Sequence, residues 1–463
     1  MLLSHARILV LGLGASGEAA TALCASRGWP VTVTDIRDRD DVASALTRLA
    51  GLPIFYCLGQ APPSCADFDL IVRSPGVPRD LPVLHEAHMH GIPVWSEIEL
   101  GAAVCPCPIT AITGTNGKST TTVLIRDLMR AAGRTALVAG NIGHPFTSSA
   151  SLMQDDDVAV IEVSASQLEN CHAFAPRTAV LTNVRREHMD VYTWEQYVAA
   201  KTRIVRNHTP DHATIANLDD PVCRQIAESS PGRAIFFSTR GPLPAGREGV
   251  FLERGQVAAI YDGDQVTVCS RRELQVPGSL PNIMAMMAVG LREGVPVKAI
   301  RDVATSYPGR EHVIEHVATA AGVDYYNDSK ATNPWSTLHA LDAFPDRPIV
   351  LITGGKDDKE ADVTPLAATL TGRVRHLITL GQTGPRTIAA ARAHGMTAIT
   401  ETTSLAEAIS QAVKVAEPGD VVLFSPGANS KDMFPDHRTR GSNFKQQVRL
   451  LCGAGRSTLL PAG

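Results

Sequence analysis

Short runs of hydrophobic residues alternate along this chain with stretches whose apolar positions recur at helical spacing. The runs at 7–12, 109–113 and 349–353 are too short for a helix and end in glycine or polar turns. Such runs are typical of buried parallel strands. Strands that alternate with helices indicate an α/β fold with mainly parallel sheets.

The pattern divides the chain into three blocks, in keeping with a length of 463 residues. Residues 1–96 have predicted strands at 7–12, 31–35, 70–73 and 92–95 and a helix at 16–27. Residues 97–306 have predicted strands at 109–113, 135–139, 158–163 and 179–182, and then a strand-rich segment, 234–276, expected to form a small extra sheet. Residues 307–463 have predicted strands at 324–327, 349–353, 376–380 and 421–425.

The composition argues against several classes of protein. Lys and Arg number 43 and Asp and Glu 47, for a net charge of −4, so no basic excess favours nucleic acid. No apolar run is long enough to span a membrane, and the first residues resemble a strand more than a signal peptide. We therefore expect a cytoplasmic protein. The nine cysteines indicate no disulfide framework, and Cys105 and Cys107 are too close together for a common zinc pattern.

A first glycine-rich loop, Gly12-x-Gly14-x-x-Gly17, follows the first strand and opens a helix. Asp35 lies 18 residues after Gly17, where a ribose-binding carboxylate occurs in dinucleotide-binding folds. The backbone amides of such a loop can approach a diphosphate. From these residues alone the ligand is NAD or another diphosphate, or the loop is a tight turn without a ligand.

A second loop, 113–120, has the sequence Thr-Gly-Thr-Asn-Gly-Lys-Ser-Thr between a strand and a helix. Its Gly-Lys-Ser ending is typical of an ATP phosphate loop, in which Lys118 reaches the phosphates and Ser119 holds Mg²⁺. Ile112 stands where the strict pattern has glycine. A carboxylate that ends an apolar strand needs a partner, which makes Glu162 a plausible metal ligand.

Further motifs extend over nearly the whole chain. They are Gly140-Asn141-Ile142-Gly143, Ile161-Glu162-Val163-Ser164, Glu187-His188-Met189-Asp190, Ala200-Lys201, Asn327-Asp328-Ser329-Lys330-Ala331-Thr332-Asn333 and Ser425-Pro426-Gly427. In these motifs the chain resembles the Mur ligases, the ATP-dependent amide ligases of peptidoglycan precursor synthesis. It is most similar to members that add D-glutamate to UDP-N-acetylmuramoyl-L-alanine through an acyl phosphate. The resemblance implies a Rossmann-like N-terminal domain, a P-loop ATPase-like central domain and a Rossmann-like C-terminal domain, and we expect a monomer.

The resemblance also assigns roles to residues. Catalytic roles fall on Lys118, His188 and Lys201. ATP contacts fall on Gly114, Thr115, Asn116, Gly117, Lys118, Ser119, Thr120, Asn282, Arg310 and Asp328. Two Mg²⁺ ions are implied at Ser119, Glu162, His188 and Lys201, the lysine as a carbamate. UDP-sugar contacts fall on Gly14, Ala15, Ser16, Asp35, Arg37, Ser74, Gly76 and Asn141. Amino-acid contacts fall on Lys330, Thr332, Lys359 and Ser430.

Several departures from the family pattern leave the amino acid open. Gly309 replaces a histidine, Lys431 and His437 replace apolar residues, and an extra residue makes either Lys356 or Lys359 the pocket lysine, with Lys359 preferred. L-glutamate is therefore an alternative to D-glutamate. An NAD-dependent oxidoreductase and a non-catalytic binding module are further alternatives, but both leave the phosphate loop and its metal residues unexplained.

Overall fold

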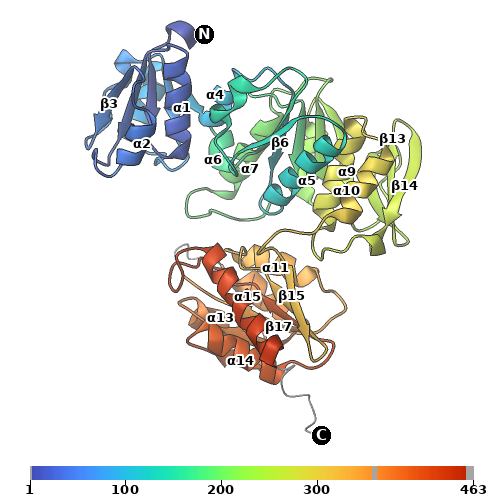
Figure 1. Ribbon diagram of the computed structural model, residues 1–463. Helices are drawn as coiled ribbons and strands as arrows, with labels where there is room; N and C mark the ends of the chain where they lie inside the picture. Colours follow the sequence, from blue (N-terminus) through green and yellow to red (C-terminus); the bar gives the residue numbers. More distant parts are fainter. Residues whose placement is uncertain (1–2, 357–361, 455–463) are drawn as a thin grey trace. The chain divides into compact units, whose positions relative to one another are not determined.

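The structure, a computed structural model, describes residues 3–356 and 362–454. It contains sheets of five, nine and six strands, and the prediction of three α/β domains is confirmed (Figure 1). The chain forms two compact units. Residues 1–274 and 281–306 make up the first and carry two of the sheets, whereas residues 275–280 and 307–463 make up the second and carry the third.

The N-terminal sheet is entirely parallel, with the strand order β3-β2-β1-β4-β5 of a Rossmann-like fold. Its strands are β1 (Ile8–Leu11), β2 (Val31–Asp35), β3 (Ile54–Leu58), β4 (Leu70–Arg73) and β5 (Val94–Ser96). Its helices are α1 (Ala15–Ser26), α2 (Ala43–Arg48) and α3 (Pro82–His90). Alternate residues of β1 bury opposite faces: Ile8 and Val10 pack with α1 and α2, and Leu9 and Leu11 with α3.

The central sheet has the order β14-β13-β12-β11-β10-β9-β6-β8-β7. Its strands are β6 (Ile109–Thr113), β7 (Ala136–Gly140), β8 (Val158–Glu162), β9 (Thr178–Leu181), β10 (Ala213–Asn217), β11 (Arg233–Ser238), β12 (Glu248–Glu253), β13 (Gln256–Tyr261) and β14 (Asp264–Ser270). Its helices are α4 (Glu97–Ala102), α5 (Lys118–Ala131), α6 (Ala165–Leu168), α7 (Trp194–Thr202), α8 (Pro221–Ser229), α9 (Leu280–Arg292) and α10 (Val297–Ser306).

The strand-rich segment after residue 233 does not form the separate small sheet that we expected. β11 pairs in parallel with β10 and with β12, and β13 and β14 add antiparallel strands beyond it. All four strands therefore extend the central sheet. The sequence pattern indicates that this segment forms strands but not which strand they pair with. The partner is β10, a strand that the pattern did not predict.

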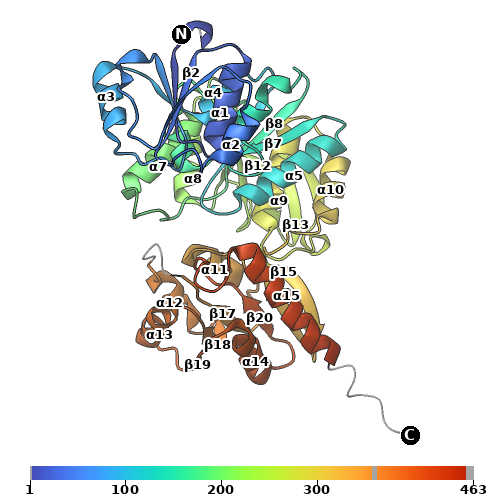
Figure 2. The same cartoon turned by 60° about the vertical axis from the view of Figure 1, so that its left-hand side comes forward.

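The C-terminal sheet has the order β15-β16-β20-β17-β18-β19 and is parallel except for β15. Its strands are β15 (Glu315–Ala320), β16 (Val323–Asn327), β17 (Ile349–Thr353), β18 (Val374–Thr379), β19 (Ile399–Glu401) and β20 (Val421–Phe424). Its helices are α11 (Pro334–Asp342), α12 (Thr364–Leu370), α13 (Gly384–Ala393), α14 (Leu405–Val415) and α15 (His437–Ala454). Figure 2 shows α11, α12 and α13 on one side of this sheet and α14 and α15 on the other.

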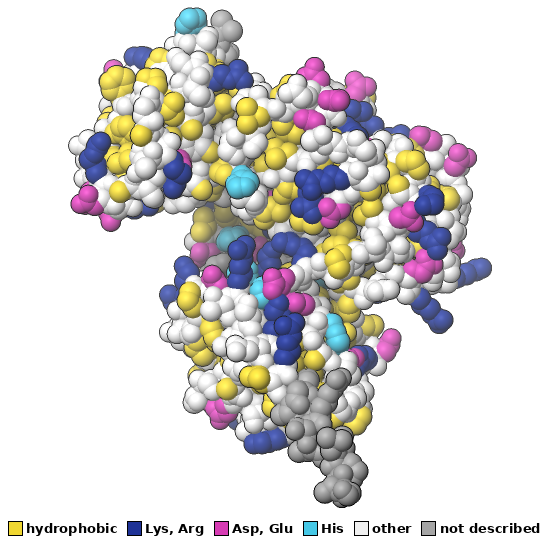
Figure 3. Space-filling model, viewed as in Figure 1, with side chains coloured by type: hydrophobic (Ala, Val, Ile, Leu, Met, Phe, Trp, Pro, Cys, Tyr) yellow, Lys and Arg dark blue, Asp and Glu magenta, His cyan; other side chains and the backbone are white. Residues whose placement is uncertain are grey.

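The surface agrees with the near-neutral composition. On the face that Figure 3 shows, Lys and Arg side chains are interspersed with Asp, Glu and hydrophobic side chains. Among the helices that the structure describes, none is both long enough and apolar enough to cross a membrane.

Candidate active site

The phosphate loop lies where its sequence pattern predicts it. Buried strand β6 ends at Thr113, and α5 begins at Lys118 after a loop of four residues. Gly117 has a φ of +83°, and a side chain there would collide with the carboxamide of Asn282 on α9. The Asn282 Oδ1 also accepts a hydrogen bond of 3.2 Å from Thr121. The residue assigned to ATP from the central domain therefore lies directly beside the loop.

Two lysine side chains converge on the loop. The Nζ of Lys118 donates to the carbonyl oxygens of Gly114 at 3.0 Å and Thr115 at 2.7 Å. The Nζ of Lys201, from α7, donates to the same Gly114 oxygen at 2.8 Å. Lys201 is only 1% exposed. Its burial, and then the nearby charge of Lys118, lower the pKa of Lys201 to about 7.

The carboxylate of Glu162 lies at the end of β8, next to β6, with Glu162 opposite Ile112 in the register. Its Oε1 accepts a hydrogen bond of 2.9 Å from the Nδ2 of Asn141. Its Oε2 is buried and has no hydrogen-bond partner in the part of the chain that the structure describes. A buried carboxylate oxygen without a donor is a suitable ligand for a divalent cation.

His188 lies in the loop that precedes α7, and its backbone has a φ of +58°. Its carbonyl oxygen accepts from the amides of Val191 and Tyr192. Its ring lies 6.5 Å from the ring of Tyr197, centroid to centroid. Tyr197 in turn contacts the hydroxyl of Thr115 in the phosphate loop at 3.3 Å. Within residues 3–356 and 362–454, no group of three or more His, Cys, Asp or Glu residues is arranged to hold a metal ion.

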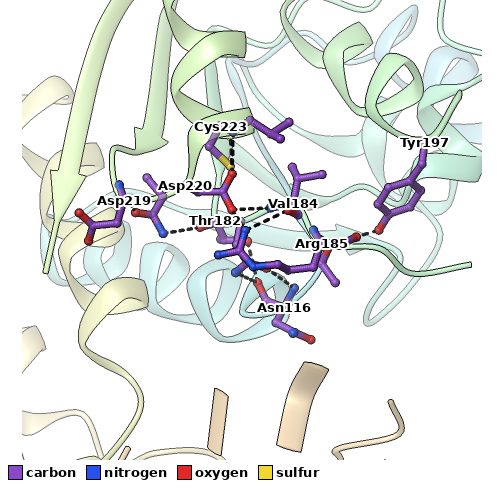
Figure 4. Close-up of polar contacts among 12 residues, drawn as sticks. Asn116, Thr182, Val184, Arg185, Tyr197, Asp219, Asp220 and Cys223 are labelled. Carbon is purple, nitrogen blue, oxygen red and sulfur yellow. Dashed lines mark hydrogen bonds and ion pairs between the residues drawn. The ribbon is translucent and has the colours of Figure 1, made fainter. Parts of the chain in front are cut away.

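A second set of contacts holds the phosphate loop from the carboxyl end of β9. The Asn116 carbonyl oxygen accepts from the Thr182 hydroxyl at 2.6 Å and from the Asn183 carboxamide at 3.0 Å. The Asn183 Oδ1 accepts from the Asn116 amide at 2.9 Å. Figure 4 shows Asn116 and Thr182 beside Arg185 and Asp220. The loop is thus fixed by polar groups beyond its own motif.

Asp220 links this region to α8. Its fully buried carboxylate caps the helix by accepting from the amides of Val222 and Cys223, both at 3.0 Å. It also accepts from the amide of Val184 at 3.1 Å and forms an ion pair with Arg185 (Figure 4). The Arg185 amide donates to the Thr115 hydroxyl at 2.9 Å. One carboxylate therefore fixes both a helix start and the segment that touches the phosphate loop.

The first glycine loop is a tight strand-to-helix turn between β1 and α1. A side chain at Gly17 would collide with the Gly12 carbonyl oxygen, which also accepts from the Ser74 hydroxyl at 3.1 Å. Gly14 and Ala15 are exposed at the start of α1. The loop is therefore closely packed on its inner side and open on its outer side, as a diphosphate site requires.

Asp35 has a defined structural role beside this loop. Its carboxylate accepts from the Leu13 amide at 2.7 Å and binds the Arg37 guanidinium at 2.9 and 2.8 Å. The hydrogen bonds from Arg37 lower the pKa of Asp35 to about 2, so it is ionised at neutral pH. Asp35 thereby holds the glycine loop and Arg37 together. Of the other residues predicted for this ligand, Gly76 is exposed after β4, Ser16 lies in the first turn of α1, and Asn141 lies in the central domain beside Glu162.

The second unit contains the remaining predicted residues. Asp328, at the end of β16, accepts from the Ile314 amide at 3.2 Å and from the Ser425 hydroxyl at 2.7 Å. Burial raises the pKa of Asp328 to about 7. The amide of Lys330 donates to the His312 carbonyl at 3.0 Å, and Arg310 forms a short antiparallel bridge with Val313.

A small cavity of about 20 Å³ lies at the carboxyl edge of this third sheet. Its lining includes Thr332, Lys356, Thr383, Arg386 and Asn429, so cations and hydroxyls face one space. Lys359, the preferred pocket lysine, lies outside the described residues. The buried residue Ser430 directly follows Asn429.

The sequence pattern did not indicate the residues that hold the phosphate loop, chiefly Thr182, Asn183 and Asp220. One signal could have found the first two. Thr182 ends the strand predicted at 179–182 and Asn183 follows it, and the carboxyl ends of parallel strands gather at one edge of a sheet. An Asp directly before Pro is typical of a helix cap, so the sequence does indicate that role for Asp220. It does not indicate the contact of Asp220 with Val184 and Arg185.

Comparisons with known proteins agree with this geometry. Residues 6–96 match the Mur ligase MurD-like N-terminal domain, 112–289 the Mur ligase middle domain, and 309–427 the Mur ligase glutamate ligase domain. The chain belongs to the Mur ligase family.

Two members of the family that are similar to this chain have the same name. The UDP-N-acetylmuramoylalanine–D-glutamate ligase of Geotalea daltonii is 39% identical, over 96% of this chain and 98% of its own. The enzyme of the same name from Symbiobacterium thermophilum is 37% identical over the same shares.

Solved structures share the fold at low sequence identity. MurC of Thermotoga maritima, a UDP-N-acetylmuramate–alanine ligase, has a TM-score of 0.56 at 18% identity, covering 96% of this chain and all of its own. MurF ligase of the same organism, solved with ADP, has a TM-score of 0.57 at 15% identity, covering 91% of this chain and 95% of its own.

Proposed function

We propose that this chain is an ATP-dependent amide ligase that joins D-glutamate to UDP-N-acetylmuramoyl-L-alanine in peptidoglycan precursor synthesis. The observation that carries the proposal is the full-length similarity to ligases of that name. The phosphate loop, with Lys118 at the start of α5, supports ATP as the energy source. The relatives and solved structures reported above are all ligases, so nothing favours the oxidoreductase alternative.

The chemistry requires an activated carboxylate. Phosphoryl transfer from ATP to the alanyl carboxylate gives an acyl phosphate and ADP, and attack by the amine of the amino acid then forms the amide and releases phosphate. Such transfer depends mainly on positioning and on neutralising charge. The amides at the start of α5 and the ammonium of Lys118 would bind the phosphate oxygens. The loop is held for that task by the contacts of Asn116 with Thr182 and Asn183.

Glu162 and Ser119 are the residues that we expect to bind Mg²⁺. The buried Oε2 of Glu162 fits such an ion because no described donor satisfies it. A bound Mg²⁺ would neutralise negative charge on the phosphates. Asn141 would orient the Glu162 carboxylate through its hydrogen bond to Oε1. We assign His188 to a second Mg²⁺ on the resemblance alone.

Lys201 is proposed to be carbamylated by CO₂. The reaction needs a neutral amine, and complete burial beside Lys118 favours the neutral form of Lys201. The Nζ of Lys201 donates to the Gly114 carbonyl oxygen and lies over the Tyr197 ring, and no described carboxylate forms an ion pair with it. Conversion of this cation into an anion would remove a repulsion with Lys118 and supply a further oxygen ligand.

The amino-acid site is proposed for the second unit, around Thr332, Lys330, Ser430 and Lys356 or Lys359. Thr332 and Lys356, which line the small cavity, offer a hydroxyl and a cation, and these groups suit a carboxylate of glutamate. We propose D-glutamate over L-glutamate because the relatives carry D-glutamate in their names. We further propose that the enzyme acts in the cytoplasm as a monomer.

The test is phosphate release from ATP with Mg²⁺ and UDP-N-acetylmuramoyl-L-alanine. Three reactions are compared: D-glutamate, L-glutamate and no amino acid. Release that needs both the UDP-sugar and D-glutamate is the expected result. Release with L-glutamate alone would retain the ligase but overturn the stereospecificity. No release with either amino acid would overturn the proposed function.

A further inference from the structure

Three sulfur atoms lie in successive close contact at a place in the central domain that has no part in the proposed reaction. The Sγ atoms of Cys105 and Cys107 are 3.5 Å apart, and the Sγ of Cys107 is 3.6 Å from the Sδ of Met153. The cysteines lie between α4 and β6, separated by Pro106. Met153 lies 46 residues away in sequence, just before β8. The fold therefore brings together three soft ligands that the sequence separates.

The surroundings of these atoms are apolar. Cys107 is 5% and Met153 8% exposed, and both belong to the hydrophobic core that includes Ala150, with Cys105 packed against it. Cys105 is half-buried, so one side of the cluster is open to an entering ion. Among the described residues, no set of three or more His, Cys, Asp or Glu side chains could complete a metal site here. Zinc, which takes four N, S or O ligands, does not fit.

We propose that Cys105, Cys107 and Met153 form a binding site for one copper(I) ion. Thiolate and thioether ligands select this soft ion over hard cations. With metal–sulfur bonds of about 2.3 Å, as in thiolate sites generally, three ligands around one ion would be about 4 Å apart. The separations of Cys107 from Cys105 and from Met153 are both within about half an ångström of this value. Each cysteine would release its proton to solvent as the ion binds.

The site is separate from the phosphate loop. The cysteines precede β6, whereas the loop follows it. At about 3.3 Å per residue, the five residues of this strand place the two about 16 Å apart along the sheet. Copper would thus bind near the amino end of β6, whereas ATP would bind at its carboxyl end. We therefore expect copper binding to be independent of the ligase reaction.

The experiment is a competition assay with the full-length chain under anaerobic, reducing conditions. Copper(I) is supplied as its complex with a chromophoric chelator, and its transfer to the protein is followed by the loss of colour. We expect one equivalent per chain, with affinity reduced at least tenfold in Met153→Leu, a change that conserves volume. We expect no specific transfer to the double variant Cys105→Ser/Cys107→Ser. Zinc offered to the wild type should not bind at this site.

Controls separate a defined site from general thiol binding. Cys57→Ser removes another half-buried cysteine, on β3, and should bind copper as the wild type does. Circular dichroism checks that each variant is folded, and Met153→Leu remains informative if the double variant is not. Unchanged binding by Met153→Leu, full retention of one equivalent by the double variant, or equal loss in Cys57→Ser would each overturn the proposal.

Discussion

Lys118 and Lys201 donate to the same oxygen, the carbonyl of Gly114, from 3.0 and 2.8 Å. Burial, and then the nearby charge of Lys118, lower the pKa of Lys201 to about 7. Lys118 is the lysine of the phosphate loop, whereas Lys201 belongs to α7, 83 residues later in the chain. This arrangement predicts different consequences for the loss of each side chain.

Replacing Lys201 with alanine should lower kcat at least 100-fold, about 2.7 kcal/mol of transition-state stabilisation. The alanine leaves a space in which a small carboxylate can take the place of the proposed carbamate. Added formate or acetate should therefore restore part of the activity. Lys298→Ala, which removes an exposed lysine on α10, is the control and should not respond to formate. Full activity of Lys201→Ala, or a complete lack of rescue, would contradict the carbamate.

Replacing Lys118 with alanine should abolish turnover, because its ammonium neutralises phosphate charge in the proposed reaction. The predicted UDP-sugar residues are mostly in the N-terminal domain, on a different sheet. Isothermal titration should therefore measure UDP-N-acetylmuramoyl-L-alanine affinity within about twofold of the wild type. A large loss of that affinity would show that the two nucleotide sites are assigned wrongly.

The sequence was most informative where a residue's role is local. The strands at 109–113 and 349–353 have the predicted bounds, because at both a mainly apolar run is followed directly by a glycine. It was least informative for contacts between distant segments. The position of Asn183 after a strand places it at the carboxyl edge of the sheet but does not identify Asn116 as its partner, and nothing local to β12 indicates that it joins β11. Such pairings depend on the packing of the whole sheet.

Asp35 is a single residue whose contacts the sequence did not indicate. Its spacing from Gly17 predicts a contact with a nucleotide, yet the structure gives its carboxylate to Leu13 and Arg37. Asp35→Asn should therefore act through the loop and Arg37. We expect KM for the UDP-sugar to rise about tenfold, the cost of a charge-assisted hydrogen bond, while KM for ATP stays constant. Asp67→Asn, at an exposed position of the same domain, is the control. An equal rise in both KM values would contradict this assignment.

Asp220→Ala should affect both stability and nucleotide binding. It removes the cap of α8, which costs about 1–2 kcal/mol, and leaves the Val184 amide and Arg185 without their carboxylate. Because the Arg185 amide binds Thr115, we expect KM for ATP to rise severalfold. Asp220→Asn keeps an oxygen for the cap and is the matched variant. If Asp220→Asn recovers the stability but KM for ATP stays raised, the ion pair with Arg185 positions the loop. If Asp220→Asn and Asp220→Ala have the same KM and the same stability, the cap and the ion pair do not have separate roles.

The buried carboxyl group of Glu97 should make the stability of the folded protein depend on pH. Its carboxyl is 1% exposed at the start of α4, and burial raises its pKa from 4.5 to about 7. Between these values the unfolded chain loses the proton while the folded chain retains it. This group's contribution to the free energy of unfolding is therefore fully present below pH 4.5, declines as the pH rises to 7, and is lost above it. The full decline corresponds to about 3 kcal/mol.

Glu97→Gln should remove this decline. Glutamine keeps the oxygen that accepts from the amide and hydroxyl of Thr147, but its NH₂ replaces an oxygen that has no described partner. We expect a constant loss of about 1–3 kcal/mol at every pH and a flatter profile between pH 5 and 8. Urea unfolding of the wild type, Glu97→Gln and the half-buried control Glu253→Gln measures the slopes. A wild-type slope retained by Glu97→Gln would show that this carboxyl titrates normally, since the constant loss alone does not change with pH.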